Sequence, residues 1–108
     1  MPIHTKLVRD LIPNVIERTG KSFTTRILSD EEYVVELRKK LQEEMQEYLE
    51  AENDKDSIEE LADVLELIHA LAKIHGANFE EVENIRRQKA VKRGGFEEKI
   101  FLIEVDDE

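Results

Sequence analysis

Two stretches of sequence decide the fold and the chemistry: KLQEEMQE at Lys40–Glu47 and ELAD at Glu60–Asp63. Each contains two acidic residues three positions apart, which are Glu44 with Glu47 and Glu60 with Asp63. Residues with this spacing share one face of a helix, so each pair directs two carboxylates the same way. A short connection between the two helices would bring the pairs face to face. The sequence therefore predicts a site built from four carboxylates.

Both acidic pairs intrude on apolar helix faces. Glu44 lies between Leu41 and Tyr48 in the apolar stripe of the first helix, and Asp63 lies one turn before Leu67 in the second. Burying a lone carboxylate costs roughly several kcal/mol, so a cation should compensate the charge. Mg2+ and Mn2+ prefer such all-oxygen sites. We predict a Mg2+ site, with Mn2+ as an alternative ion; ordinary solvated glutamates are the competing interpretation.

Apolar periodicity and capping signals predict an all-α chain. We expect a short helix within 6–20 that Asp10 caps and a long helix over about 30–52. A second long helix should be capped by Asp56 or Ser57 and end at Gly76, and a further helix should start at Asn78 and end before Gly94. Two segments, 22–28 and 99–105, are rich in β-forming residues. They could pair as a short two-stranded ribbon beside the helices.

The second long helix is apolar around most of its circumference. One side carries Ile58, Leu61, Leu65, Ile68 and Ala72, and another carries Val64, Leu67, Leu71 and Ile74. Such a helix is buried on several sides, and one short chain can hardly enclose it. We therefore expect an antiparallel helical bundle completed by oligomerisation, as a homodimer or tetramer. His69, near the apolar side, is expected to be a packed structural histidine.

Composition limits the class of protein. A length of 108 residues predicts a single domain over 1–108. The absence of cysteine excludes disulfides and thiolate metal sites. A net charge of -10 argues against nucleic-acid polymers as partners. No apolar stretch has the length of a signal peptide or a membrane span, so we expect a cytoplasmic protein without a membrane partner.

A basic cluster follows the acidic pairs. Lys89, Lys92 and Arg93 have helical spacing and precede Gly94-Gly95. Lysine and arginine are the usual partners of phosphate oxygens, so the cluster could hold a polyphosphate whose metal lies at the carboxylates. The alternative is a helix C-terminus that is enriched in cations because they complement the helix dipole.

The two acidic motifs with their spacing resemble the MazG-type branch of the all-α nucleoside triphosphate pyrophosphohydrolase superfamily, which also includes phosphoribosyl-ATP pyrophosphohydrolase. The opening Lys6–Asp10 with Ile12-Pro13, and the ending Lys89–Phe96, resemble small single-domain house-cleaning members. The resemblance covers about residues 6–100.

The resemblance implies that Mg2+ ions are ligated by Glu44, Glu47, Glu60 and Asp63. It also implies that Glu43 binds a second metal ion or orients water, as the catalytic carboxylate, and that Lys89, Lys92 and Arg93 contact phosphates. One position departs from the family pattern, because Arg87 stands where MazG proteins have asparagine. The role of the Lys6–Asp10 segment stays open.

The function implied is metal-assisted hydrolysis of a nucleoside triphosphate, of standard or non-standard base, to a monophosphate and pyrophosphate. Hydrolysis of phosphoribosyl-ATP is the alternative within enzymes. A non-catalytic, metal-binding oligomerisation module is the alternative outside them. The sequence identifies neither the base nor the sugar of the substrate.

Overall fold

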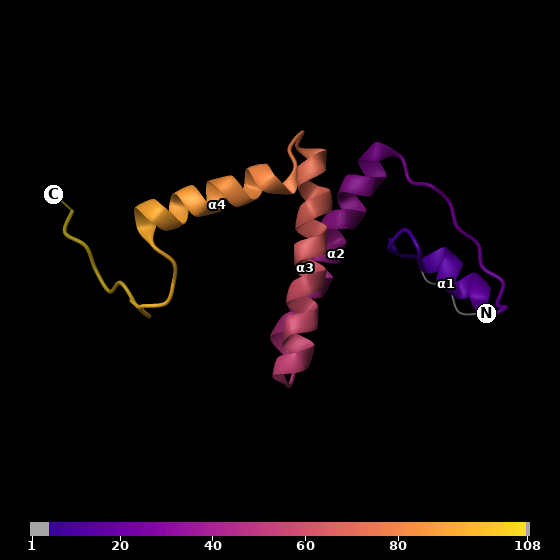
Figure 1. Cartoon of the computed structure of the whole chain (residues 1–108), viewed down its shortest axis with the longest axis horizontal. Helices are drawn as coiled ribbons and strands as arrows, with labels where there is room; N and C mark the ends of the chain where they lie inside the picture. The colour runs from indigo at the N-terminus through magenta and orange to yellow at the C-terminus, as the bar shows by residue number, and fades with distance from the viewer. Residues whose placement is uncertain (1–4, 108) are drawn as a thin grey trace.

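The computed structural model describes residues 5–107 and contains four helices. They are α1 (Ile12–Arg18), α2 (Asp30–Glu50), α3 (Asp54–Ile74) and α4 (Phe79–Arg93). The prediction of an all-α chain is confirmed. The predicted strands at 22–28 and 99–105 are wrong, because no strand forms anywhere in 5–107. One segment precedes α2 and the other follows α4, and they lie on opposite sides of the molecule, too far apart to pair (Figure 1).

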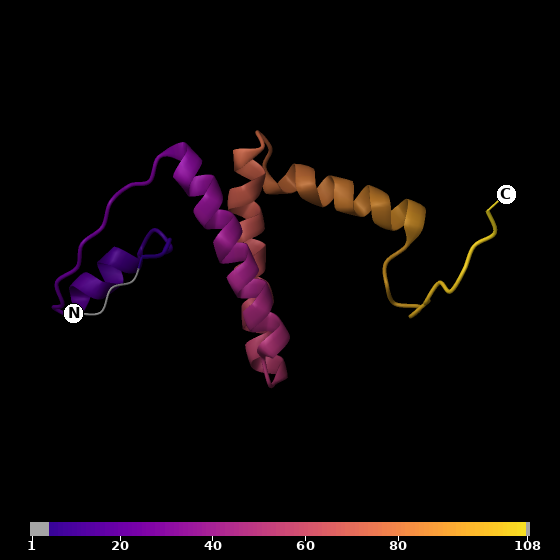
Figure 2. The same cartoon turned by 180° about the vertical axis from the view of Figure 1, so that it is seen from behind.

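Helices α2 and α3 form an antiparallel hairpin, which Figures 1 and 2 show from opposite sides. Ser29 caps α2 in a capping box with Glu32, as the start signal near residue 30 predicts. The cap of α3 is Asn53, whose side chain accepts a hydrogen bond from the Asp56 amide at 2.8 Å. The predicted cap at Asp56 or Ser57 is therefore wrong by three or four residues. The connection between α2 and α3 consists of residues 51–53 and is shorter than expected.

The core of a single chain is thin. Among apolar residues in the described range, only Leu37 and Ala72 are buried. The chain exposes 10272 Å², whereas a compact chain of 12.6 kDa exposes roughly 6,200 Å². Its radius of gyration is 18.7 Å, against about 13 Å for a compact domain of this size. The extended shape is that of one subunit of an oligomeric bundle.

The outer helices add little to this core. Helix α4 starts beside the end of α3, where His69 and Phe79 stack with ring centroids 4.0 Å apart, in line with the structural role expected for His69. It then projects sideways from the hairpin, while α1 lies on the other side (Figures 1 and 2). No side chain caps α1, so the predicted cap at Asp10 is wrong. Within 5–107, no helix is both long and apolar enough to cross a membrane.

Candidate metal centre

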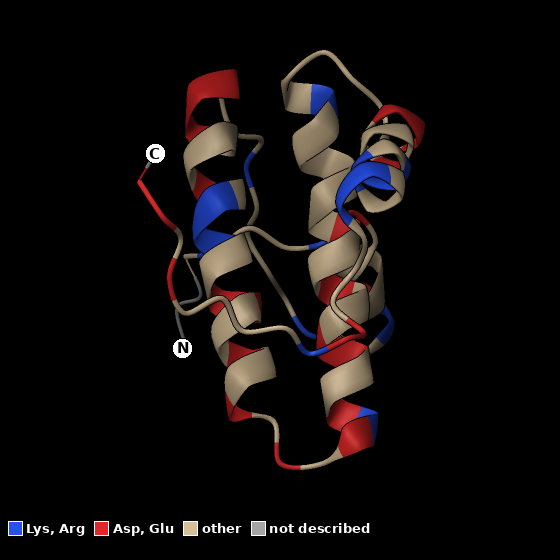
Figure 3. Cartoon of the chain, turned by 90° about the vertical axis from the view of Figure 1, so that its left-hand side faces the viewer, with Lys and Arg blue, Asp and Glu red and all other residues tan. Residues whose placement is uncertain are grey.

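The α2–α3 hairpin brings together carboxylates that are far apart in sequence. Glu44 and Glu47 on α2 and Glu60 on α3 each offer an oxygen within 4.8 Å of the others. The two helices run side by side and carry acidic segments along both ribbons (Figure 3). We call Glu44, Glu47 and Glu60 the three-glutamate cluster. Three of the four predicted metal ligands thus converge.

Burial makes the cluster energetically unusual. Glu44 is 8% exposed, and it is the only buried charged residue in the described part of the chain. Burial, then proton sharing with Glu60 and repulsion from Glu47, raise the pKa of Glu44 to about 7. A hydrogen bond with Glu44 lowers the pKa of Glu60, but desolvation and the nearby negative charges outweigh it and raise that pKa overall. The protein alone therefore holds these negative charges at a cost.

Two buried oxygen atoms of the cluster have no hydrogen-bond partner among the described residues, Oε2 of Glu44 and Oε2 of Glu60. Buried polar atoms are normally satisfied, and an unsatisfied pair calls for an explanation. A divalent cation would be coordinated by both oxygens, and its charge would offset the repulsion that raises the pKa of Glu44. The donor set is all oxygen, as Mg2+ and Mn2+ prefer. The residues present therefore fit such an ion.

Asp63, the fourth predicted ligand, has another partner. Its Oδ1 lies 2.6 Å from Nη2 of Arg9, which belongs to the segment before α1. Both side chains are about half exposed, and an exposed ion pair contributes roughly 0 to 1 kcal/mol. Replacing Arg9 by another partner of Asp63 therefore costs little free energy. The ion pair brings the N-terminal segment against the hairpin next to the three-glutamate cluster.

Glu43 lies outside the three-glutamate cluster but next to it. Its Oε2 is 3.5 Å from Nζ of Lys40, and the same nitrogen is 3.9 Å from Oε1 of Glu44. Lys40 therefore links the candidate catalytic carboxylate to the candidate metal ligand. The contact to Glu44 is long and leaves Oε2 of that residue unsatisfied, so Lys40 only partly neutralises the cluster.

The basic cluster does not reach the carboxylates within one chain. Asp63 precedes the end of α3 by roughly 16 Å of helix, at about 1.5 Å per residue. Lys89, Lys92 and Arg93 lie at the far end of α4, which projects away from the hairpin (Figure 1). Arg86, nearer the start of α4, pairs with Glu83 on the same helix. Contact of this cluster with a substrate at the carboxylates would need a second chain.

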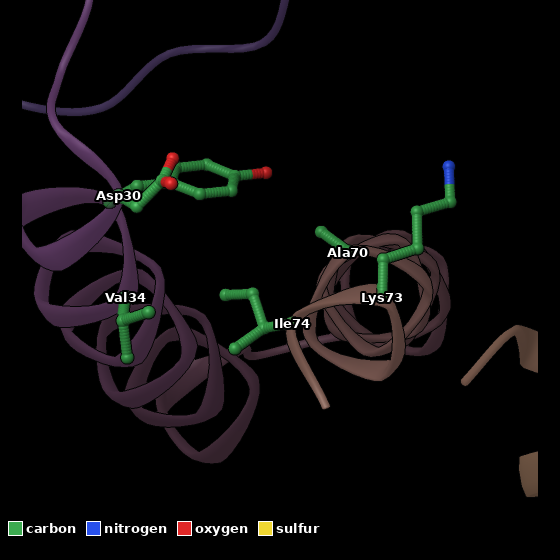
Figure 4. Close-up of a pocket in the computed structure, with 6 residues that line it drawn as sticks. Asp30, Val34, Ala70, Lys73 and Ile74 are labelled. Carbon is green, nitrogen blue, oxygen red and sulfur yellow. The ribbon is translucent and has the colours of Figure 1, made fainter. Parts of the chain in front are cut away.

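A separate pocket lies away from the three-glutamate cluster. It measures about 390 Å³ and opens where the N-terminal end of α2 separates from the C-terminal end of α3. Tyr33, Val34 and Ile74 line it together with one carboxylate, Asp30, and one lysine, Lys73 (Figure 4). A single carboxylate does not make a magnesium site, so the three-glutamate cluster is the better candidate for the chemistry.

The sequence model of the family described as Phosphoribosyl-ATP pyrophosphohydrolase matches residues 5–89. The chain belongs to this family. The match includes all four predicted metal ligands and the N-terminal segment, and it ends at Lys89. Neither the comparison with curated proteins nor the comparison with solved structures gives a match. Membership confirms the predicted relationship to the all-α pyrophosphohydrolases and identifies a hydrolase that acts on a nucleotide anhydride bond.

Sequence reasoning missed the part that the N-terminal segment plays. The motif KLVRD at Lys6–Asp10 contributes to the resemblance, but its spacing indicates no contact with residues more than 50 positions away. The structure places Arg9 on Asp63 and brings Thr5, Lys6 and Leu7 against α2. The signal in the sequence was the pair of cations, Lys6 and Arg9, within this short motif of a chain whose net charge is -10.

Proposed function

We propose that the protein is a Mg2+-dependent hydrolase that cleaves a nucleoside triphosphate between the α and β phosphates. The products are a nucleoside monophosphate and pyrophosphate. The observation that carries this proposal is the pair of buried, unpartnered oxygens on Glu44 and Glu60 in a chain of the pyrophosphohydrolase family. Mn2+ would support the same reaction.

In this proposal Glu44, Glu47 and Glu60 hold the metal, and Asp63 joins them when Arg9 releases it. The exchange is inexpensive because the Arg9–Asp63 pair is exposed. Bound Mg2+ would polarise phosphoryl oxygens and lower the pKa of water. Glu43 is our candidate for the residue that orients the attacking water and accepts its proton, since its side chain is half exposed beside the cluster.

The phosphate-binding role of Lys89, Lys92 and Arg93 is proposed only across a subunit interface. Helix α4 carries them away from the carboxylates of their own chain (Figure 1). The large apolar surface supports a homo-oligomer, in which the site of one chain could receive α4 from another. We propose a homodimer or tetramer.

Phosphoribosyl-ATP is the second candidate substrate, and the description of the matching family favours it. It is itself a nucleoside triphosphate, so the same bond would be broken at the same cluster. The ends of the chain, Lys6–Asp10 and Lys89–Phe96, instead resemble house-cleaning members. We therefore rank ordinary or damaged nucleoside triphosphates first.

A panel of triphosphates that includes phosphoribosyl-ATP, assayed with Mg2+ for pyrophosphate release, tests the proposal. Glu44→Gln should lower turnover of any active substrate by roughly 100-fold or more, since a metal ion supplies several kcal/mol and each 1.4 kcal/mol is tenfold. Release of inorganic phosphate and a diphosphate would contradict the proposed bond. Binding of metal without turnover of any substrate would favour the non-catalytic oligomerisation module.

A further inference from the structure

A second pocket lies beside the three-glutamate cluster, and its chemistry is cationic. It measures about 170 Å³ and is formed by α2 and the segment before α1. Three lysines line it, Lys6 from the N-terminal segment and Lys39 and Lys40 from α2. Two glutamates also line it, Glu36 and Glu43, so the lining carries one net positive charge in a chain whose net charge is -10.

The two glutamates do not neutralise the pocket. Lys39 pairs with Glu36 at 3.2 Å and Lys40 with Glu43 at 3.5 Å, and each pair lies within one turn of α2. Such local pairs contribute little and exchange easily for a stronger anion. Lys6 arrives from a distant part of the sequence and makes no ion pair with any described carboxylate. Three cations that converge on one hollow with only two local partners indicate room for an anionic ligand.

The pocket adjoins the candidate metal centre through Lys40. The Nζ atom of Lys40 lies 3.9 Å from Oε1 of Glu44, and Lys40 is also one of the residues that line the pocket. A polyphosphate held by a cation at the cluster would therefore extend past Lys40 into the pocket. Small-molecule sites usually measure roughly 300–1,000 Å³. A pocket of about 170 Å³ suits a fragment such as a diphosphate and not an entire nucleotide.

We propose that Lys6, Lys39 and Lys40 form the binding site for the β and γ phosphates of the substrate, and hence for the pyrophosphate product. This inference rests on the proposed function and names the groups that hold the leaving group. Lysine is a compact point charge on a flexible stem and suits phosphate oxygens. The same N-terminal segment that delivers Lys6 also carries Arg9 to Asp63, so it lies across both halves of the site.

Calorimetric titration with inorganic pyrophosphate, in the presence of Mg2+, tests this site directly. The variants are Lys6→Met, Lys39→Met and the double variant, in which the apolar stem of each side chain is retained. Loss of one charge-assisted contact should weaken pyrophosphate binding roughly tenfold, and the double variant should lose more. The matched control is Lys73→Met, because Lys73 lines the separate 390 Å³ pocket and should not affect binding.

A nucleoside monophosphate serves as a second ligand. Its affinity should stay unchanged in the lysine variants, because its only phosphate is the α phosphate. The inference is overturned if the parent does not bind pyrophosphate, if the double variant binds it as tightly as the parent, or if monophosphate binding weakens equally. If the lysine variants lose pyrophosphate but no triphosphate is hydrolysed, the pocket stands and the proposed function fails. If the parent hydrolyses a triphosphate but the lysine variants bind pyrophosphate as tightly as the parent, the proposed function stands and the pocket assignment fails.

Discussion

The α2–α3 hairpin and the α4 arm differ in how many of their contacts lie within one chain. The α4 arm consists of α4 and the segment 94–107. The hairpin has capped helices, a buried contact at Leu37 and three converging carboxylates. The α4 arm contacts the end of α3, where Phe79 stacks on His69. Most of its other apolar residues are exposed to solvent, with Phe96 99% and Phe101 89% exposed. One chain therefore builds the acidic half of the site, while the arm lacks the partner that would bury it.

The largest effect is expected when a charge is placed on the exposed apolar face of α3, because this tests whether another chain buries that face. Leu61 and Leu65 are 47% and 45% exposed in the single chain. Because the core of one chain is small, we expect both leucines to be buried by a second chain. Leu61→Asp or Leu65→Asp should dissociate the oligomer or unfold it, because a charge buried in an interface costs several kcal/mol.

Light scattering and circular dichroism at micromolar concentration measure the outcome. Lys73→Asp places the same charge at an exposed polar position of the same helix and should leave the assembly intact. A parent protein that is monomeric at this concentration would contradict the argument from exposed surface.

Removing one charge from the basic cluster of α4 should have a smaller effect than the α3 substitutions. Lys89→Met should weaken turnover about tenfold, as expected for loss of one charged contact to phosphate, with little loss of stability because the side chain is exposed. If α4 acts on the site of another chain, mixing Lys89→Met with Glu44→Gln and allowing subunits to exchange should restore part of the activity.

Steady-state kinetics before and after mixing measure this restoration. Two Glu44→Gln preparations mixed in the same way are the control and should stay inactive. Unchanged activity of Lys89→Met would show that the cations only complement the dipole of α4. Lost activity without restoration would place Lys89 and Glu44 in a site formed by one chain.

The remaining prediction concerns pH. The pKa of Glu44 rises from 4.5 to about 7 in the folded, metal-free protein, so folding favours the protonated form. This contribution to stability is complete below about pH 4.5 and is lost as pH rises through about 7. The melting temperature of metal-free protein should therefore fall by roughly 10 °C or more between pH 5 and about 8, since a pKa rise of this size is worth roughly 2 to 3 kcal/mol over that range and roughly 1 kcal/mol corresponds to about 4–8 °C.

Thermal melts in EDTA at several pH values provide the measurement. Glu44→Gln carries no titrating group at this position, so its melting temperature should fall less over the same range. Equal pH dependence in the parent and the variant would mean that Glu44 titrates like an ordinary surface glutamate.

The α2–α3 hairpin could be predicted from the sequence because the patterns that indicate it are local. Apolar periodicity fixed α2 and α3 to within a few residues, and the three-residue spacing placed Glu44 and Glu47 on one face. Other features were not readable because they depend on distant contacts. The β pattern at 99–105 had no partner to pair with, and Arg9 reaches Asp63 only through the path of the chain before α1. The separation of the basic cluster from the carboxylates depends on the direction of α4, which no local pattern encodes.

The central claim is that the three-glutamate cluster holds a divalent cation, and thermal melts with EDTA or Mg2+ test it most directly. The variants are Glu44→Gln and, as a matched control, Glu59→Gln, which neutralises an exposed glutamate of α3 outside the cluster. Mg2+ at 100 times its dissociation constant should stabilise the parent and the control by about 2.7 kcal/mol, because it binds only the folded state. That gain corresponds to roughly 10 °C or more. Glu44→Gln should lose most of it, and a full Mg2+ shift in Glu44→Gln would contradict the account.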